Sequence, residues 1–219
     1  LGLDASVLGL PPLPEGLTRV GEVEFFFDFS SPFAYLASTQ IERVAASAGA
    51  QVVFRPFLLG ALFKSIGTTN VPMLGFSAAK QAYVARDIAR HAKRYGVPFQ
   101  FPSTFPIRSV TPLRVALAAG DGIGPVTHTL FHAAWAQDRD ISSPDSLREI
   151  LAGAGHDPEL VTRTEDPAIK DQLRQHTDRA EQLGLCGAPS FLVGEHLLWG
   201  QDRLELVRRT LEGWRPKAG

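Results

Sequence analysis

The stretch EFFFDFSSPFAYLA, Glu24 to Ala37, decides the fold because it joins a strand pattern directly to a helix pattern. Every second residue from Val23 to Phe29 is apolar, and a further phenylalanine stands between them, so the spacing predicts a strand that is buried on nearly both faces. From Pro32 onward, apolar residues recur at intervals of three and four, which predicts an amphipathic helix. Two hydroxyls and a proline thus stand where a buried strand meets a buried helix.

The pattern after this stretch returns to strands at both ends of a long helical segment. The sequence GAQVVFRPF predicts a second strand, and the resulting strand-helix-strand unit favours a parallel pair with a right-handed crossover. Alanine-rich helical patterns then follow one another, and we expect an all-helical insertion with a small core of its own. Next comes a helix that ends at Gly184, two short strands joined at Gly194-Glu195, and a closing helix. This order is typical of a thioredoxin-like α/β sheet interrupted by a helical domain. The predicted parts are an irregular arm (1–20), the thioredoxin-like domain (21–70 and 166–214) and the insertion domain (71–165).

Composition and charge exclude several classes of function. The 219 residues carry a net charge of −1, with acidic and basic residues mixed along the chain, so no basic stripe indicates nucleic acid. No apolar run approaches the ~20 residues of a membrane span, and the first 20 residues lack the basic start of a signal peptide. We therefore expect a cytoplasmic protein that has no membrane partner.

The cysteine and histidine content argues against disulfide and metal chemistry. The single cysteine, Cys186, excludes a disulfide framework within the chain. His128 and His132 stand four residues apart on a predicted helix, a spacing that can bind a metal, but no glutamate lies between them and no third ligand is apparent. We interpret both as ordinary surface or packing histidines and expect no metal.

The residues Ser30-Ser31-Pro32 have two interpretations. In the first, Ser31 caps the helix and Pro32 takes the first helical position, where its missing N–H costs nothing. In the second, the place matters, because a thioredoxin-like unit carries its C-x-x-C dithiol at this helix start. Here the window runs from Ser31 to Ala34, and without a thiolate it cannot perform disulfide exchange. It can still hold a thiolate brought from outside, because a hydroxyl and a helix N-terminus together can lower the pKa of a thiol by ~2 units, about 2.7 kcal/mol.

Two later motifs fit such a site. CGAPSF contains Ala188-Pro189 where the thioredoxin architecture places a cis proline, and the preceding residue then offers its backbone N–H and C=O to an extended peptide. WGQDRLELV predicts either a plain turn with a capped helix, or a helix start where Gln201 and Asp202 face a ligand and Asp202 holds an ammonium group. We expect Cys186 to be a packed thiol, because no CxxC partner or basic neighbour flanks it.

Four segments in this order resemble the 2-hydroxychromene-2-carboxylate isomerases and the related kappa-class glutathione transferases. They are FDFSSPFAYLA, FKSIGTTNVP (the loop after the second strand), GAPSFLVG and LLWGQDRLELV, and the resemblance runs from Glu22 to Gly213. The glutathione-binding residues that it implies are Ser31 at the sulfur, where it is also the catalytic residue, and Asn70, Ala188, Pro189, Gln201 and Asp202. The substrate-binding residues that it implies are Lys64 and Arg108. Asn70 departs from the family pattern, because two threonines separate it from the preceding glycine.

The activity implied by the resemblance is a glutathione-dependent isomerisation in the catabolism of aromatic compounds. Glutathione adds to a conjugated enone, the bond so freed rotates, and elimination regenerates glutathione, so that a cyclic aromatic acid becomes an open trans-benzylidenepyruvate. Lys64 and Arg108 suit the carboxylate and the developing enolate charge. Two alternatives stay open, a kappa-like glutathione S-transferase and a non-catalytic glutathione- or peptide-binding module. A homodimer is also left open.

Overall fold

The sheet is built around strand β1 (Glu22–Phe27), the strand with the two-sided apolar pattern. In this computed structural model, which describes residues 18–215, the strand order is β2-β1-β3-β4. β2 (Gln51–Pro56) pairs parallel with β1, whereas β3 (Ser190–Val193) and β4 (His196–Trp199) follow in antiparallel pairing. The predicted thioredoxin-like sheet is confirmed, including the final hairpin. Residues 1–17 of the predicted arm lie outside the described residues.

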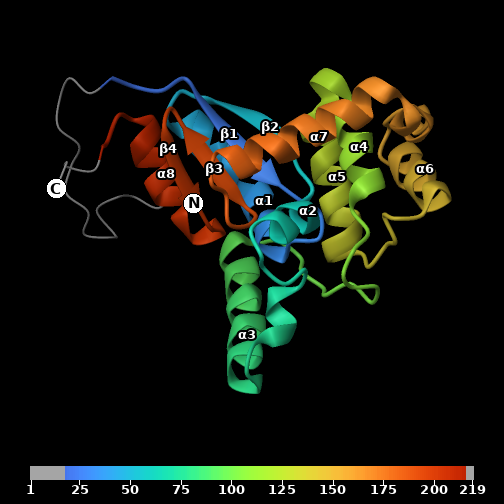
Figure 1. Cartoon of the computed structure of the whole chain (residues 1–219), viewed down its shortest axis with the longest axis horizontal. Coiled ribbons are helices and arrows are strands. Elements are labelled where there is room, and N and C mark those ends of the chain that lie inside the picture. Colours follow the sequence, from blue (N-terminus) through green and yellow to red (C-terminus); the bar gives the residue numbers. More distant parts are fainter. Residues whose placement is uncertain (1–17, 216–219) are drawn as a thin grey trace.

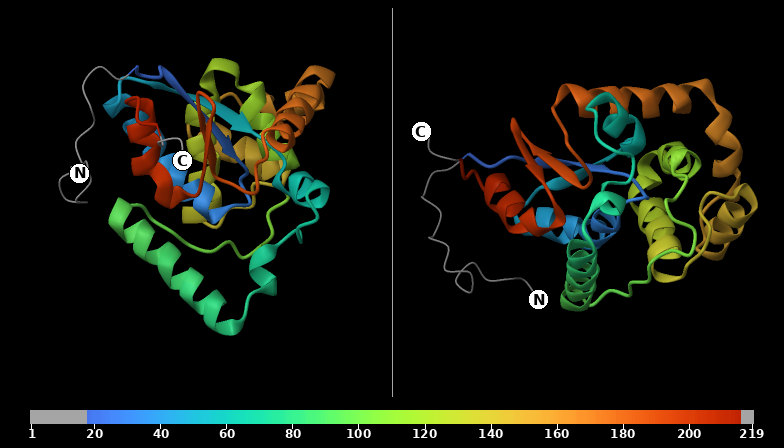
Figure 2. Two further views of the ribbon diagram at one scale, coloured as in Figure 1. Left: turned by 60° about the vertical axis from the view of Figure 1, so that its left-hand side comes forward. Right: turned by 60° about the horizontal axis from the view of Figure 1, so that its bottom comes forward.

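Helices cover both faces of this sheet (Figures 1 and 2). α1 (Pro32–Ser47) and α8 (Leu204–Leu211) pack against each other on one face, and α7 (Pro167–Gln182) crosses the other. The phenylalanines of β1 are therefore fully buried on both sides. Each contributes about 1.5–3 kcal/mol relative to an exposed ring, so β1 is held firmly at the point where it delivers the chain to α1.

The insertion is helical, as predicted, but it shares one core with the sheet. Its elements are η2 (Pro72–Gly75), α3 (Ala78–Tyr95), α4 (Val110–Ala118), η3 (Gly120–Gly122), α5 (Ile123–Ala136), α6 (Pro144–Gly153) and η4 (Pro158–Glu165). Phe131 of α5 packs on Phe29 with ring centroids 4.7 Å apart, and Trp135 Nε1 donates to the Phe29 carbonyl at 2.8 Å. The expectation of a separate core was wrong because these α5 side chains complete the hydrophobic cluster at the end of β1. The boundaries at 71 and 165 stay a prediction.

A short helix, α2 (Leu59–Ser65), follows the second strand and extends over the first three residues of FKSIGTTNVP, the segment expected to be a loop. The residue before it, Leu58, provides no side-chain cap. Instead, the carboxylate of Asp28, just after β1, accepts a hydrogen bond from Leu59 N at 2.9 Å. A long-range partner thus supplies the capping interaction that helix starts need, which local sequence could not reveal.

Helix α3 projects away from the rest of the molecule (Figures 1 and 2). Of its 18 residues, only Ile88 and Ala92 are buried, and both lie in its C-terminal half, which contacts α1. Its N-terminal half is therefore largely in solvent. Within residues 18–215, none of the helices combines the length and the apolar character needed to cross a membrane.

Candidate functional site

Ser31 begins helix α1 and connects it to the loop before β3. Its Oγ accepts a hydrogen bond from Ala34 N at 3.1 Å, the N-cap interaction, while Pro32 takes the first helical position. The same hydroxyl donates its proton to the carbonyl of Ala188 at 2.9 Å. Ser31 is 4% exposed, so both interactions are shielded from bulk water. The hydroxyl therefore does more than cap, because it also bridges the helix start to the peptide that precedes Pro189.

The first turn of α1 keeps one backbone donor available. Pro32 has no N–H, Ala34 N is taken by the Ser31 hydroxyl, and Tyr35 N donates to the Ser31 carbonyl. Within residues 18–215, no partner is found for the remaining N–H of this turn, that of Phe33. A free N–H beside a hydroxyl at the positive end of a helix is a favourable place for an anion.

The loop before β3 adopts the predicted cis geometry at Ala188-Pro189. The Pro189 carbonyl accepts a hydrogen bond from Gly200 N at 3.0 Å, which brings the segment after β4 against this loop. Gly187 has no room for a side chain, since a Cβ there would lie 2.7 Å from the Trp199 indole nitrogen. The indole therefore packs directly on the backbone of the loop.

Gln201 and Asp202 follow Gly200, whose φ of +109° few other residues adopt, and open the short 3₁₀ helix η5 (Gln201–Arg203). Gln201 is 4% exposed, and its Oε1 accepts a hydrogen bond from Tyr95 at 2.8 Å. Asp202 is exposed and forms an ion pair with its neighbour Arg203 at 2.6 Å. Such an exposed pair contributes little, about 0–1 kcal/mol, so a ligand ammonium group can replace Arg203 at small cost.

Asp28 is the buried polar centre beneath Ser31, and sequence reasoning did not single it out. It is fully buried and accepts hydrogen bonds from Ser30 N at 2.8 Å, from Ser30 Oγ at 2.9 Å and from Leu59 N at 2.9 Å. The hydroxyl of Ser109, at the start of α4, faces the same carboxylate. Burial raises the pKa of Asp28, and these hydrogen bonds act against that rise. Three segments of the chain thus meet at one carboxylate. Ser30 hydrogen-bonds to this buried carboxylate, so its role, unlike that of Ser31, is structural.

Asn70 and Lys64 lie at opposite ends of α2. A Cβ on Gly60, in the first turn, would meet Asn70 Oδ1 at 2.8 Å, so the Asn70 side chain lies over this turn, next to the Leu59 amide held by Asp28. Lys64 is exposed in the last turn. In the described part of the chain no hydrogen bond links either residue to Ser31, so their predicted roles remain predictions.

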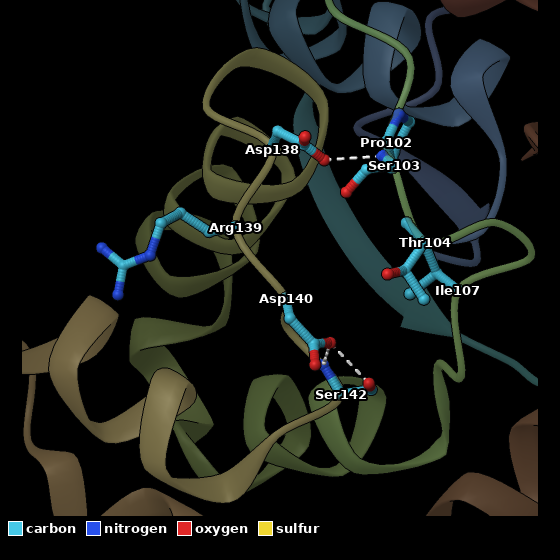
Figure 3. A pocket seen from close by; sticks show the side chains of 8 residues that line it. All are labelled: Pro102, Ser103, Thr104, Ile107, Asp138, Arg139, Asp140 and Ser142. Atoms are coloured by element: carbon cyan, nitrogen blue, oxygen red, sulfur yellow. Dashed lines mark hydrogen bonds between the residues drawn. The ribbon is translucent and has the colours of Figure 1, made fainter.

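Arg108 is exposed and directly precedes Ser109. Its charge acts on Asp140, although hydrogen bonds from Ser142 are the main reason that the pKa of Asp140 is lowered. Figure 3 shows Asp140 and Asp138 lining a cavity beneath the loop 102–107, with Asp138 accepting from Ser103 N at 2.7 Å. Its volume of about 30 Å³ holds no more than a water molecule, so this cavity is no substrate pocket. Arg108 thus lies near Asp140, one of the acidic residues that line this small cavity. Its role in substrate binding remains a prediction.

The remaining thiol and the two histidines lie elsewhere. The expectation that Cys186 is a packed thiol was wrong, because this residue is exposed. Partial desolvation still raises the pKa of its thiol, which is the opposite of activation. His128 Nε2 lies 2.8 Å from Glu42 Oε2, and both His128 and His132 line an open cleft of about 510 Å³ between α5 and α6. No group of three or more metal-ligating side chains is found among residues 18–215.

Several curated proteins are similar to the chain over most of its length. It is 26% identical over 190 residues to 2-hydroxychromene-2-carboxylate isomerase of Sphingobium xenophagum, an alignment that covers 86% of this chain and 97% of that protein. It is 27% identical over 210 residues to glutathione S-transferase kappa 1 of Homo sapiens, with 88% and 92% covered. The relatives therefore include both an isomerase and a transferase.

Solved structures support the same fold. A 2-hydroxychromene-2-carboxylate isomerase superposes with a TM-score of 0.77 at 24% identity, covering 87% of this chain and 94% of that one. The cytosolic disulfide reductase DsbM from Pseudomonas aeruginosa, solved with GSH, superposes with a TM-score of 0.59 at 20% identity, covering 87% and 97%. Residues 22–212 match the DSBA-like thioredoxin domain family, and the chain therefore belongs to this family.

Proposed function

We propose that the protein is a glutathione-dependent isomerase that acts on an aromatic acid resembling 2-hydroxychromene-2-carboxylate. One observation carries the proposal: a buried serine hydroxyl stands at the redox position of a thioredoxin-like helix start, hydrogen-bonded to the peptide before Pro189. With Ser31 and Ala34 at the two sulfur positions, the window cannot exchange disulfides. Its donors suit a sulfur supplied by a ligand.

The polar groups around Ser31 fit glutathione in its extended form. The free Phe33 N–H and the Ser31 hydroxyl suit the sulfur, and the backbone of Ala188 suits the central peptide. Gln201 and Asp202 suit the charged γ-glutamyl end. When bound, glutathione supplies a thiolate that adds to an enone and leaves after bond rotation. Because the ligand is regenerated, the overall change is an isomerisation.

The Ser31 hydroxyl has one proton to donate, so a hydrogen bond to a bound sulfur must replace the hydrogen bond that it now donates to the Ala188 carbonyl. Donating to a thiolate means giving up the bond to the Ala188 carbonyl, which is then free to accept an N–H of the ligand backbone. A hydrogen bond to a charged partner stabilises by about 1.5–3 kcal/mol, and the neutral bond that it replaces by about 0.5–1.5 kcal/mol. The difference, roughly 1–1.5 kcal/mol, lowers the pKa of the thiol by about one unit.

The substrate carboxylate needs a cation, and Lys64 and Arg108 are the proposed partners. Both are exposed, Lys64 in the last turn of α2 and Arg108 just before α4. Their charges would offset the negative charge that develops on the substrate. The cytoplasm is the proposed location, because reducing compartments keep glutathione in its thiol form.

A kappa-like transferase is the second candidate, favoured by the similarity to the human kappa-class enzyme. The same site would then pass the thiolate to an electrophile that keeps it. The two reactions differ in their use of glutathione, which an isomerase regenerates and a transferase consumes. Turnover of a hydroxychromene carboxylate with substoichiometric glutathione would support the isomerase, and stoichiometric loss of thiol would support the transferase.

The decisive experiment is a pH titration of enzyme-bound glutathione, followed by the ultraviolet absorbance of its thiolate. We expect Ser31→Ala to raise the midpoint by about one unit and to lower activity near neutral pH, with partial recovery at higher pH. The loss of the N-cap should cost about 1–2 kcal/mol of folding stability. Ser47→Ala, at the exposed end of the same helix, is the matched control. Equal midpoints in wild type and Ser31→Ala would make Ser31 a cap alone, and no bound thiolate in the wild type would favour a non-catalytic module.

A further inference from the structure

A hydrogen bond joins the projecting helix to the candidate glutathione site. Tyr95, the last residue of α3, donates its hydroxyl to Oε1 of Gln201 at 2.8 Å, although the two residues are 106 positions apart. Burial raises the pKa of Tyr95, and together with the charge of Asp202 it outweighs the opposite effect of Arg94 and Arg43. The phenol therefore keeps its proton at neutral pH and remains a donor.

This bond is the polar connection between α3 and the thioredoxin-like domain. Within residues 18–215, α3 makes no other hydrogen bond or ion pair with that domain. The remaining attachment is apolar, through Ile88 and Ala92 on the side that meets α1. Apolar packing holds the helix in place but does not orient the Gln201 amide. The hydrogen bond from the Tyr95 phenol does orient it.

The bond also decides which end of the Gln201 amide is available. With Oε1 held by Tyr95, the free end is Nε2. No hydrogen bond donated by Nε2 is found in the described residues, and the atom is not among the fully buried unpaired ones. The backbone of Gln201 is fixed beside Pro189 through Gly200 N, so only the side-chain torsions remain to be set.

We infer that Tyr95 is a positioning residue for ligand recognition: by holding Oε1 of Gln201, it presents the amide N–H groups to the α-carboxylate of the γ-glutamyl group. This inference rests on the proposed glutathione site. Amide N–H groups donate to a carboxylate, whereas a flipped amide would turn its own oxygen toward that charge. In the observed orientation the Tyr95 hydroxyl donates to Oε1, and without this bond the amide could turn either end toward the carboxylate. The bond thus gives the site a preference for thiols that carry a γ-glutamyl group.

Calorimetric titration of two thiols tests this role. Glutathione carries the γ-glutamyl group, and cysteinylglycine lacks it. We expect Tyr95→Phe to weaken glutathione binding about 3- to 10-fold, the effect of one neutral hydrogen bond, and to leave cysteinylglycine binding unchanged. Tyr83→Phe, a 55% exposed tyrosine on the same helix, is the matched control and should leave both affinities unchanged.

A double-mutant cycle with Gln201→Ala shows whether Tyr95 acts through Gln201. We expect the double variant to bind glutathione as weakly as Gln201→Ala alone, with circular dichroism confirming that each variant is folded. An equal loss for both thiols, additive losses in the cycle, or an unchanged affinity in Tyr95→Phe would overturn the inference while the glutathione site stands. A wild-type protein that binds no glutathione would overturn the proposed function and this inference with it.

Discussion

Strand β1 has a buried carboxylate near each end, and the two are stabilised in opposite ways. In its first half, Glu24 contacts two guanidinium groups, through Arg55 Nε and Arg179 Nη2, each at 2.5 Å. Just beyond its other end, Asp28 receives hydrogen bonds from neutral amide and hydroxyl groups. Burial acts to raise the pKa of Glu24, but the arginines outweigh it and the pKa is lowered, whereas the pKa of Asp28 is raised.

The two carboxylates have different structural roles: Glu24 attaches neighbouring elements to β1, and Asp28 positions the residues around the candidate site. The arginines of Glu24 are partly exposed, with 31% and 45% of their side chains accessible, so they fasten α7 and β2 to β1 but can turn to water if the carboxylate is lost. The donors of Asp28 are short and fixed, two of them being backbone N–H groups. The Leu59 donor is buried and cannot turn to water as the arginines can, so the carboxylate sets the start of α2 relative to the turn before Ser31. Glu24, away from the candidate site, is stabilised by ion pairs, whereas Asp28, next to the candidate site, is stabilised by hydrogen bonds from neutral groups.

The largest expected effect comes from removing each carboxylate in turn. Asp28→Ala leaves the buried Leu59 N–H and the partly buried Ser30 N–H and hydroxyl without their partner, at about 1–3 kcal/mol for a buried donor, so we expect a loss of about 3 kcal/mol in the free energy of unfolding. Glu24→Ala frees two arginines that can reach solvent, and we expect a loss nearer 1 kcal/mol. Urea unfolding of both variants measures the contrast. Equal losses would mean that the two ends of the strand do not differ in this way.

A smaller effect, with opposite signs at the two ends, is expected from pH. A raised folded-state pKa means that Asp28 binds more protons in the folded state, so its contribution to stability falls as the pH rises above its ordinary value of 3.8. Glu24, with a lowered pKa, contributes stability above 4.5 that is lost as the pH falls through its folded-state value.

Urea unfolding between about pH 3 and pH 7 tests these signs. Relative to wild type, the deficit of Asp28→Asn should shrink as the pH rises, and that of Glu24→Gln should shrink as the pH falls. Deficits that change in the same direction for both variants would contradict the assignment.

The smallest effect is expected from Ser30. Ser30→Ala removes one donor to Asp28 but keeps the bonds from Ser30 N and Leu59 N, so we expect a loss of about 0.5–1.5 kcal/mol. The thiolate midpoint of bound glutathione should not change, in contrast to Ser31→Ala. A shift as large as that of Ser31→Ala would show that the neighbouring serines share one role.

The fold could be predicted from the sequence because its signals are local. The change from period two to period three-and-four at Pro32 predicts β1 and α1, and the short apolar runs around Gly194 predict the hairpin. The capping of α2 was not predictable, because its partner, Asp28, lies 31 residues before Leu59. A side-chain contact between residues so far apart produces no periodic pattern in the sequence from which it could be predicted.

The candidate site divides in the same way. Ser31 and Pro189 could be singled out because the thioredoxin architecture fixes where a helix start and a cis proline belong, and the structure brings them together. Tyr95 was missed, since nothing in the alanine-rich pattern of α3 distinguishes it from Tyr83. The substrate role of Arg108 rested on the resemblance alone. The charge of Arg108 acts on Asp140 of this chain, so a basic residue in an exposed loop does not by itself indicate a substrate-binding site.

The hydroxyl and the methyl group at the two sulfur positions have a consequence for how the protein responds to its surroundings. A dithiol at Ser31 and Ala34 would exist in oxidised and reduced forms, with populations set by the potential of the compartment. Here the helix start has no such pair of forms, and Cys186, the only thiol in the chain, lies outside the window. Under the proposed function, sulfur chemistry at this helix uses a thiol taken from solution. The rate of that chemistry would then depend on how much of the thiol is present, and the window from Ser31 to Ala34 has no thiol of its own to oxidise.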